Sequence, residues 1–329
     1  FAPEDFMASS APKTWFLKLR MWLLLTVLFG IVYAFVAAIS FYFGISNFIF
    51  YGVVAVGFVL LQYMIGPYIV QLTMGVKYVS EKEEPELHEL ISDLAKKAGI
   101  PKPKIGISPT PVPNAFAFGR WLSDGRVCVT QGIMNLLSKK ELEAVLGHEI
   151  CHLKHRDVMI ITLISVIPMI CWFLARGALF SRSDDNKGGA VAIGVIAFAL
   201  YFITNLLVLY GSRIREYYAD TGSVALGNAP HSLASALFKL VHGSAKINPA
   251  AVKQIAGMKA FFVNDISRAH DEIRQIADLD LDKSGHIDEH ELAQMKSQHI
   301  HLRTVDKLME AMSTHPNMLK RIKALSEMK

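Results

Sequence analysis

Four long runs of apolar residues constrain the fold of this chain more than any other feature. Residues 21–43 and 48–70 contain no charged side chain, and the short segment GISN separates them. Two further runs lie at 158–175 and 190–210, on either side of a charged segment. A helix of about 20 apolar residues crosses a hydrocarbon layer of about 30 Å. Because 52% of the 329 residues are hydrophobic and only 19% are charged, the runs predict a mainly α membrane protein with four transmembrane helices.

The four predicted helices pair as two hairpins, at 21–70 and 158–210. The third run is short and contains Pro168, so a buried or re-entrant helix is the alternative to a span. The first run follows basic residues as a secretory signal would, but its apolar core exceeds the roughly 7–15 residues of a signal and indicates an anchor. Asn205 in the fourth run is explained by a hydrogen bond between helices.

Basic residues near the ends of the runs predict which side of the membrane each loop faces. If the chain crosses the membrane four times, most of these basic residues fall on the same side, which is then the cytoplasmic side. They are Lys13, Lys18, Arg20, Lys77, Lys154, Arg156, Arg213 and Arg215. The net charge of +5 therefore indicates contact with anionic lipid rather than with nucleic acid. The three cysteines are scattered and odd in number, which suggests a reducing compartment without a disulfide framework.

A polar domain on the cytoplasmic side is predicted to consist of residues 71–157 and 211–329, with 1–20 as a separate N-terminal segment. An amphipathic helix is expected near its start, from the spacing of Leu87, Leu90, Ile91 and Leu94. Alternating apolar residues predict three short strands, at 104–107, at 114–118 and from Gly125. The polar domain is therefore expected to be of the α+β class, with a small sheet.

The sequence HEICH in this domain is typical of a metal site on a helix. Ser138 and Glu141 have the spacing of a capping box, which places His148 well inside a helix. On that helix His148 and His152 lie one turn apart on one face and can hold one zinc ion at about 2.0–2.1 Å. Glu149 reaches the metal-bound water rather than the metal, so we expect it to act as the general base. A chance match on a histidine-rich helix is the alternative.

A third zinc ligand must come from elsewhere in the chain. His155 is about 10.5 Å further along the helix axis than His148, too far to bind the same ion. Glu216 and Asp220 follow the fourth apolar run at positions i and i+4, so both carboxylates face one way. We predict that Glu216 completes a His₂Glu site and that Asp220 hydrogen-bonds a ligand histidine. The alternative is that these acids only pair with neighbouring arginines on a solvated helix.

The order of these motifs resembles the HtpX family of membrane zinc metalloproteases, which are related to the CAAX prenyl proteases. The resemblance rests on the two N-terminal runs, NAFAFG, HEICHLKHRD, the second apolar pair, SRIREYYAD and STHPNMLKRIKAL, and it covers nearly the whole chain. It implies a zincin-like domain with one catalytic Zn²⁺ per subunit, bound by His148, His152 and Glu216, with Glu149 as base. It also implies that His315 binds substrate or stabilises the oxyanion. An edge strand would bind extended substrate, at Asn114, Ala115, Phe116, Ala117 and Phe118.

One further motif is not general to that family. The loop 280–291, DLDKSGHIDEHE, has the twelve-residue spacing of an EF-hand, with glycine at position six. Its candidate Ca²⁺ ligands are Asp280, Asp282, Ser284, His286 and Glu291. Helical patterns flank the loop on both sides. A degenerate hand that serves only as a rigid elbow is the alternative.

The resemblance therefore implies a zinc-dependent endopeptidase that cleaves misfolded or membrane-associated proteins at the cytoplasmic face, in protein quality control. Its expected location is a prokaryotic cytoplasmic membrane, with the active site towards the cytoplasm and with the lipid bilayer and protein substrates as partners. A prenyl-protein processing protease and a non-catalytic calcium-binding membrane protein are the alternatives. The absence of ionisable residues within the apolar runs argues against a transporter.

Overall fold

The computed structural model describes residues 48–179, 187–245, 269–298 and 303–328, together with Leu23 and Val27. The segment 1–20 lies outside the described residues, as does the first predicted span apart from those two positions. The N-terminal half contains α2 Phe48–Thr73, β1 Lys77–Tyr78, α3 Pro85–Ala98, β2 Lys104–Ser108, β3 Ala115–Phe118, β4 Arg126–Thr130, α4 Gln131–Leu136, α5 Lys139–Lys154 and α6 Asp157–Leu179. The C-terminal half contains α7 Lys187–Ala225, α8 Pro230–Ala245, α10 Ala269–Ile276, α11 Glu289–Met295, α12 Thr304–Ala311 and α13 Met318–Ser326.

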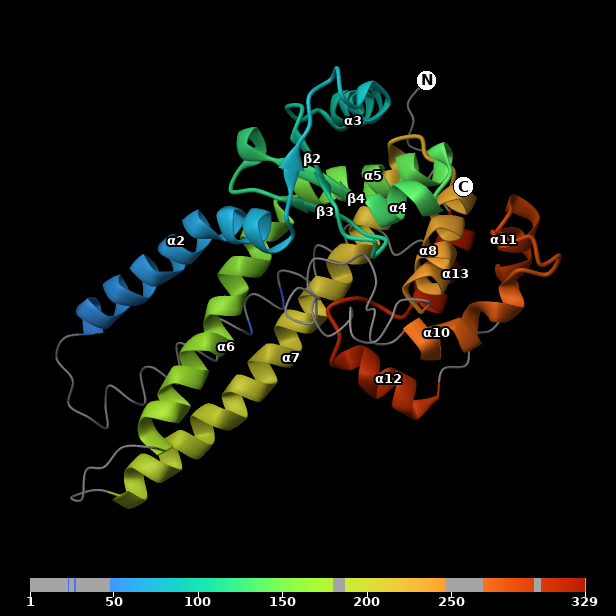
Figure 1. Cartoon of the computed structure of the whole chain (residues 1–329). Coiled ribbons are helices and arrows are strands. Elements are labelled where there is room, and N and C mark those ends of the chain that lie inside the picture. The colour runs from blue at the N-terminus through green and yellow to red at the C-terminus, as the bar shows by residue number, and fades with distance from the viewer. Residues whose placement is uncertain are drawn as a thin grey trace, which may run out of the picture.

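Three of these helices correspond to apolar runs. α2 covers the second run, and α6 and α7 contain the third and fourth. α6 and α7 lie side by side and extend away from the body that carries the sheet (Figure 1). Within the described part of the chain, one segment, Val191–Ala225, is both long enough and apolar enough to cross a membrane. The mainly helical fold is thus confirmed, with one candidate span, and the four membrane crossings remain predictions.

A four-stranded mixed sheet forms the β part of the body, with strand order β1-β2-β4-β3. β2 and β4 are parallel, whereas β1 and β3 pair antiparallel with their neighbours. The three predicted strands are all present. The two-residue strand β1 was not predicted, because so short a segment has no periodicity to detect. β3 lies at one edge of the sheet, as expected for the segment 114–118.

The two faces of the sheet pack against different helices. Val127 and Val129 of β4 face the main core, which also contains the buried sides of α3, α5, α8 and α13. Phe116 and Phe118 of β3 face a smaller core that includes the end of α2. On the α5 side β3 presents only alanines, so this helix can approach the edge strand closely.

The start of α5 is fixed by the predicted capping box. The Ser138 backbone N–H donates to Glu141 Oε2 at 2.8 Å, and the Ser138 hydroxyl donates to the same atom. Glu141 also accepts a hydrogen bond of 2.6 Å from Ser235 of α8, so the first turn of α5 is tied to a second helix. The helix ends at Lys154, and Arg156 follows with a left-handed φ of 57°. This break separates α5 from α6.

α5 crosses the polar end of α7 at very short range. A Cβ atom added at Gly147 would lie 2.3 Å from Asn228 Nδ2, and one added at Gly222 would lie 2.4 Å from Cys151 Sγ. The Ser223 hydroxyl donates to the Ala144 carbonyl at 2.6 Å across the same contact. Glycine at these positions lets the two helices meet, and their contact places residues of α7 beside the HEICH segment of α5.

Candidate active site

The imidazoles of His148 and His152 come together on the buried face of α5. They lie one helical turn apart, and their Nε2 atoms are 3.0 Å from each other. The His148 side chain is only 2% exposed and that of His152 is 16% exposed. Burial lowers the pKa of His152 to about 4, so this imidazole is neutral at pH 7 and its lone pair is available to a metal.

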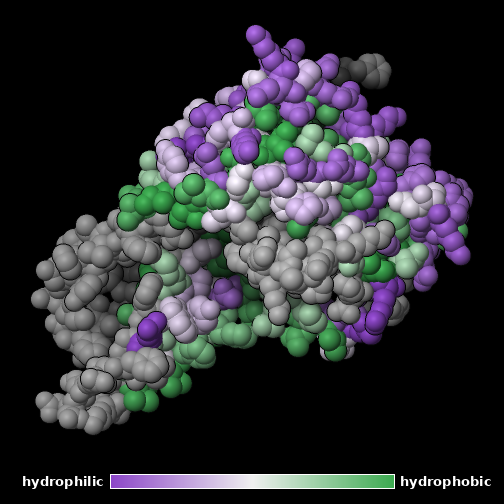
Figure 2. Space-filling view, in the orientation of Figure 1, coloured by the Kyte–Doolittle hydropathy of each residue, from purple (hydrophilic) through white to green (hydrophobic). Residues whose placement is uncertain are grey.

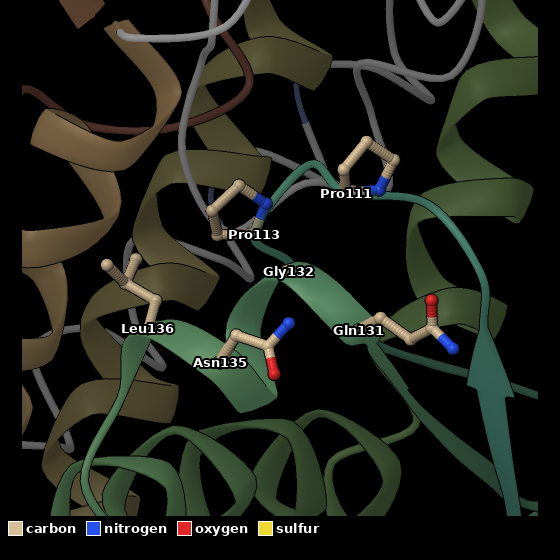
Figure 3. Close-up of a pocket in the computed structure, with 6 residues that line it drawn as sticks. All are labelled: Pro111, Pro113, Gln131, Gly132, Asn135 and Leu136. Carbon is tan, nitrogen blue, oxygen red and sulfur yellow. The ribbon is translucent and has the colours of Figure 1, made fainter.

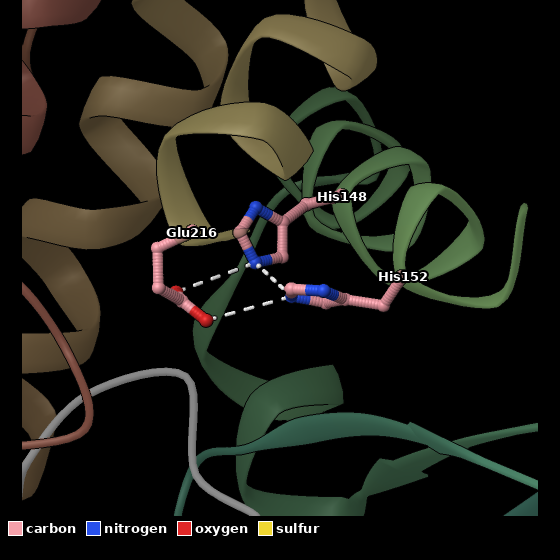
Figure 4. A group of neighbouring side chains, drawn as sticks. All are labelled: His148, His152 and Glu216. Carbon is pink, nitrogen blue, oxygen red and sulfur yellow. Dashed lines mark hydrogen bonds and ion pairs between the residues drawn. The ribbon is translucent and has the colours of Figure 1, made fainter. Parts of the chain in front are cut away.

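Glu216 of α7 completes a three-residue group with these histidines (Figure 4). Its Oε2 lies 3.6 Å from His148 Nε2, and its Oε1 lies 3.5 Å from His152 Nε2. Ligands of a tetrahedral zinc ion at about 2.0–2.1 Å are separated by about 3.3–3.4 Å. The observed separations of 3.0, 3.5 and 3.6 Å bracket that value, so the donor set and its geometry fit zinc.

Carboxylates orient both imidazoles from behind. Asp220 Oδ1 lies 2.9 Å from His148 Nδ1, and Asp157 Oδ2 lies 2.6 Å from His152 Nδ1. When each Nδ1 carries the ring proton and donates a hydrogen bond to its carboxylate, the Nε2 atoms are unprotonated and their lone pairs face Glu216. Sequence reasoning missed Asp157. Asp157 could have been considered because it is only five residues from His152 in the sequence. The helix break at Arg156, between the two residues, was not predicted.

Glu149 points to the other side of the site, towards the edge strand. It is 4% exposed and accepts a hydrogen bond from the backbone N–H of Ala117 in β3. Burial, opposed mainly by the nearby His148, raises the pKa of the Glu149 carboxyl to about 7. A carboxyl with a pKa near neutrality suits a general base, because it can both take up and release a proton at the working pH.

The C-terminal segment adds two residues to the site. His315 Nδ1 lies 3.3 Å from Glu216 Oε2, and neither ring nitrogen has a hydrogen-bond partner among the described residues. Arg321 of α13 is fully buried; it donates to Asp220 at 2.7 and 2.9 Å and lies 3.1 Å from Glu216. Arg321 was not predicted, because nothing in KRIKAL distinguishes it from the neighbouring lysines.

Comparison with known proteins identifies the family. The model of "Peptidase family M48" matches residues 81–329. The chain belongs to peptidase family M48. A "Protease HtpX homolog" of Methanothermobacter thermautotrophicus is 53% identical over 229 residues, which cover 70% of this chain and 87% of the relative. A second "Protease HtpX homolog", from Moorella thermoacetica, is 36% identical over 256 residues, 75% of this chain and 84% of the relative. The crystal structure of S. mikatae Ste24p aligns with a TM-score of 0.47 and 18% identity, covering 95% of this chain and 66% of that one.

The edge strand β3 of this M48 chain lies next to the Glu149 carboxyl. In β3, Phe116 and Phe118 are opposite Cys128 and Arg126 of β4, and Thr130 N–H donates to the Asn114 carbonyl at 2.9 Å. In an antiparallel ladder, alternate residues direct their backbone groups to opposite sides. The register therefore directs the backbone groups of Ala115 and Ala117 away from β4, towards Glu149.

An open hollow of about 310 Å³ lies beside the start of this strand (Figure 3). It is lined by Pro111, Pro113, Gln131, Gly132, Asn135 and Leu136. None of these is a member of the His148 group, so the hollow is separate from the candidate metal site.

The predicted EF-hand-like loop of this M48 chain lies between α10 and α11. The carboxylates of Asp280, Asp282 and Glu291 lie close enough together to hold one metal ion. Asp280 accepts hydrogen bonds from the N–H groups of Ser284 and Gly285 at 2.9 and 2.8 Å. The Ser284 hydroxyl donates to the His286 carbonyl at 3.3 Å. Helices α10 and α11 flank the loop, and both the EF-hand assignment and calcium binding stay predictions.

Proposed function

We propose that this chain is a zinc-dependent membrane endopeptidase with a His₂Glu site. His148, His152 and Glu216 would hold the metal, and their convergence from α5 and α7 is the observation that carries the proposal. When bound, zinc would lower the pKa of a coordinated water towards about 7 and polarise the scissile carbonyl. Asp220 and Asp157 would keep the two imidazoles in the tautomer that presents Nε2 to the metal.

Glu149 would move the protons of the reaction. Its carboxylate takes the proton of the attacking water and passes it to the leaving amine, in the roles of general base and then general acid. His315 lies beside Glu216, with Nδ1 at 3.3 Å from Oε2, and a protonated ring nitrogen of His315 would donate to a developing oxyanion. Arg321 neutralises the paired carboxylates of Glu216 and Asp220, which would otherwise repel each other in a buried site.

Extended substrate would bind along β3 by strand addition. Ala115 and Ala117 supply backbone groups on the outward side of this edge strand, beside Glu149. Binding through backbone hydrogen bonds gives affinity without demanding particular side chains. Loose selectivity of this kind suits an enzyme that cuts misfolded or membrane-associated proteins.

We further propose that the enzyme lies in a prokaryotic cytoplasmic membrane with its site on the cytoplasmic side. Support comes from the apolar length of α7, from the four apolar runs and from the distribution of basic residues. Both relatives named above carry the name "Protease HtpX homolog" and come from prokaryotes, which supports the prokaryotic location.

The direct test compares purified wild-type protein with Glu149→Gln and with the control Glu143→Gln, which makes the same change on α5 outside the site. Zinc content is measured by mass spectrometry, and cleavage of casein is followed in detergent. We expect all three proteins to contain one zinc ion and only Glu149→Gln to be inactive. A wild-type protein that neither binds zinc nor cuts casein would exclude the proposal.

We also propose that the loop 280–291 binds Ca²⁺. The three convergent carboxylates and the flanking helices support this assignment. The loop is linked to the catalytic helix, because the Ile287 N–H donates to the Ser235 hydroxyl at 3.2 Å, and Ser235 in turn donates to Glu141 at the start of α5.

A further inference from the structure

The polarity of α12 is the reverse of that expected for a helix on a water-exposed surface. Its apolar side chains point outward: Val305, Leu308, Met309 and Met312 are 63%, 64%, 43% and 59% exposed. They recur at i, i+3, i+4 and i+7 and so form one stripe along the helix. Below, "the α12 stripe" means these four residues. Soluble proteins place such a stripe against the core, and an outward stripe marks a contact with another apolar phase.

The acidic side chains of α12 point inward instead. Asp306 and Glu310 are each 7% exposed. Arg303 donates to Asp306 at 3.1 Å, and Lys320 of α13 pairs with Glu310. The pair between Arg303 and Asp306 is local to α12, whereas the pair between Glu310 and Lys320 ties the helix to α13 and holds the α12 stripe outward.

Arg213 of α7 determines where the C-terminal end of α12 lies along the axis of α7. Its Nη1 donates to the carbonyls of Glu310, Ala311 and Ser313 at 2.9, 3.0 and 2.7 Å, and so caps the C-terminal end of α12. One turn earlier on α7, Tyr210 is 38% exposed and lies 5.9 Å from the Arg213 guanidinium. Aromatic and basic residues in this order are typical of the boundary between hydrocarbon and headgroups. Figure 1 shows α12 beside α7 with its axis turned away from that of α7, as expected of a helix that lies along the surface of a bilayer that α7 crosses.

We propose that α12 is an interfacial helix whose stripe enters the headgroup–acyl boundary of the bilayer that α7 crosses. The occupant of the stripe is lipid, because the exposed apolar part of α7, which includes Phe202 and Ile203, precedes Arg213 along the same helix, and Arg213 holds the end of α12. Figure 2 shows hydrophobic atoms along this lower edge of the molecule. Basic side chains such as Lys307, which is exposed, can reach the headgroups.

The α12 stripe is too small to hold a second copy of the chain. A stable protein interface involves about 20–30 residues on each side, against the four residues of the stripe. Lipid binding by α12 would also position His315, if the chain is the protease proposed above. The segment from Ser313 to His315 follows α12 closely, so a helix held at the membrane surface would fix the distance of His315 from the candidate metal site.

The test uses full-length protein, one copy per lipid nanodisc, with a fluorophore on a single introduced cysteine. Cys128, Cys151 and Cys171 are buried, so labelling of Leu308→Cys is expected to be selective. The control is Glu89→Cys on α3, an exposed position in the body. We expect lipids with a nitroxide near the headgroup to quench the label at 308 but not at 89, and aqueous iodide to do the reverse. Equal iodide quenching at both positions would overturn the proposal, as would a label at 308 that is shielded from iodide but not quenched by lipid, because protein would then cover the stripe.

A functional arm separates this inference from the proposed activity. Leu308→Asp with Met312→Asp is compared with Lys82→Asp, which makes the same change in net charge at an exposed position of the body away from α12. We expect the double variant to cleave a membrane-inserted substrate about tenfold more slowly, since charged side chains disfavour immersion, and to cleave casein at the wild-type rate. Equal loss against both substrates would indicate a purely structural helix and contradict the proposal. Failure of the wild type to cleave casein would instead count against the proposed protease alone, because the quenching result does not depend on activity.

Discussion

Replacing Glu149 by glutamine should stabilise the metal-free protein while abolishing its activity. The carboxyl is buried beside Glu216, and burial raises its pKa from 4.5 to about 7. A raised pKa means that the folded state holds this proton more tightly than the unfolded state does. The wild type therefore loses stability as the pH rises from about 4.5 to about 7, and above pH 7 the full cost is present. A neutral glutamine avoids that cost and can still accept the Ala117 hydrogen bond.

The size of the effect follows from the shift. About 2.5 pKa units at 1.36 kcal/mol each give about 3 kcal/mol at pH 8, and under about 1 kcal/mol at pH 5. At roughly 2 °C per kcal/mol for a chain of this size, Glu149→Gln should melt about 6 °C above the wild type at pH 8 and within about 2 °C of it at pH 5. The pH dependence distinguishes removal of a charge from an improvement in packing, which would persist at both pH values.

The assay is thermal unfolding in detergent with excess chelator, followed by circular dichroism at pH 5 and pH 8. Glu143→Gln serves as the matched control and should melt with the wild type at both pH values. The reasoning is refuted if Glu149→Gln melts with the wild type at pH 8, or if its gain is the same at pH 5. Casein cleavage by the zinc-loaded proteins then shows whether the stabilising change also removes the catalytic base.

Three further changes test the helix contact, the buried arginine and the acidic loop. Gly147→Ala adds a Cβ only 2.3 Å from Asn228 Nδ2, so it should push α5 from α7 and weaken zinc binding about tenfold despite the higher helix propensity of alanine. Zinc titration checks this against Gly66→Ala on α2, where the added Cβ meets nothing within 4 Å, and equal affinities would show that the contact does not position the ligands. Arg321→Met should destabilise the metal-free protein by about 3–5 kcal/mol, because it leaves Asp220 and Glu216 buried without their cation. Added zinc should restore part of the lost melting temperature, and an unchanged melting curve would contradict this role. Calorimetric titration should show Ca²⁺ binding with a Kd on the order of 10⁻⁵–10⁻³ M that Asp280→Asn weakens about tenfold. Binding that the substitution leaves intact would place calcium elsewhere.

Local periodicity made much of the candidate site predictable. His148 and His152 are one turn apart in any helix, and the Ser138 capping box was enough to place them in one. Glu216 and Asp220 could be predicted because their own i, i+4 spacing faces them one way, next to an apolar run that had to pack against its neighbour. The strands were found from their alternation, although β1 is too short to show any.

The residues that were missed depend on contacts far apart in the chain or on irregular backbone. Arg321 reaches Asp220 across 101 positions, and no local pattern encodes that distance. Asp157 is close in sequence to His152, but the two residues are separated by a helix break at Arg156, whose left-handed conformation no local pattern predicts. Arg213 was considered as a partner of the nearby acids, whereas its side chain binds the end of α12. Which cation meets which anion is decided by packing of the whole domain.

α7 continues without a break from the apolar run to Ala225, so one rigid rod links the bilayer to Glu216. Glu216 follows Tyr210 by six residues, which at 1.5 Å per residue places it about 9 Å beyond the end of the apolar run. An extended polypeptide advances about 3.3 Å per residue. A chain leaving the hydrocarbon would therefore supply about three residues before a peptide bond could reach the candidate metal ligands. We expect bonds closer to a membrane segment than that to escape cleavage, because the length of α7 keeps them from the site.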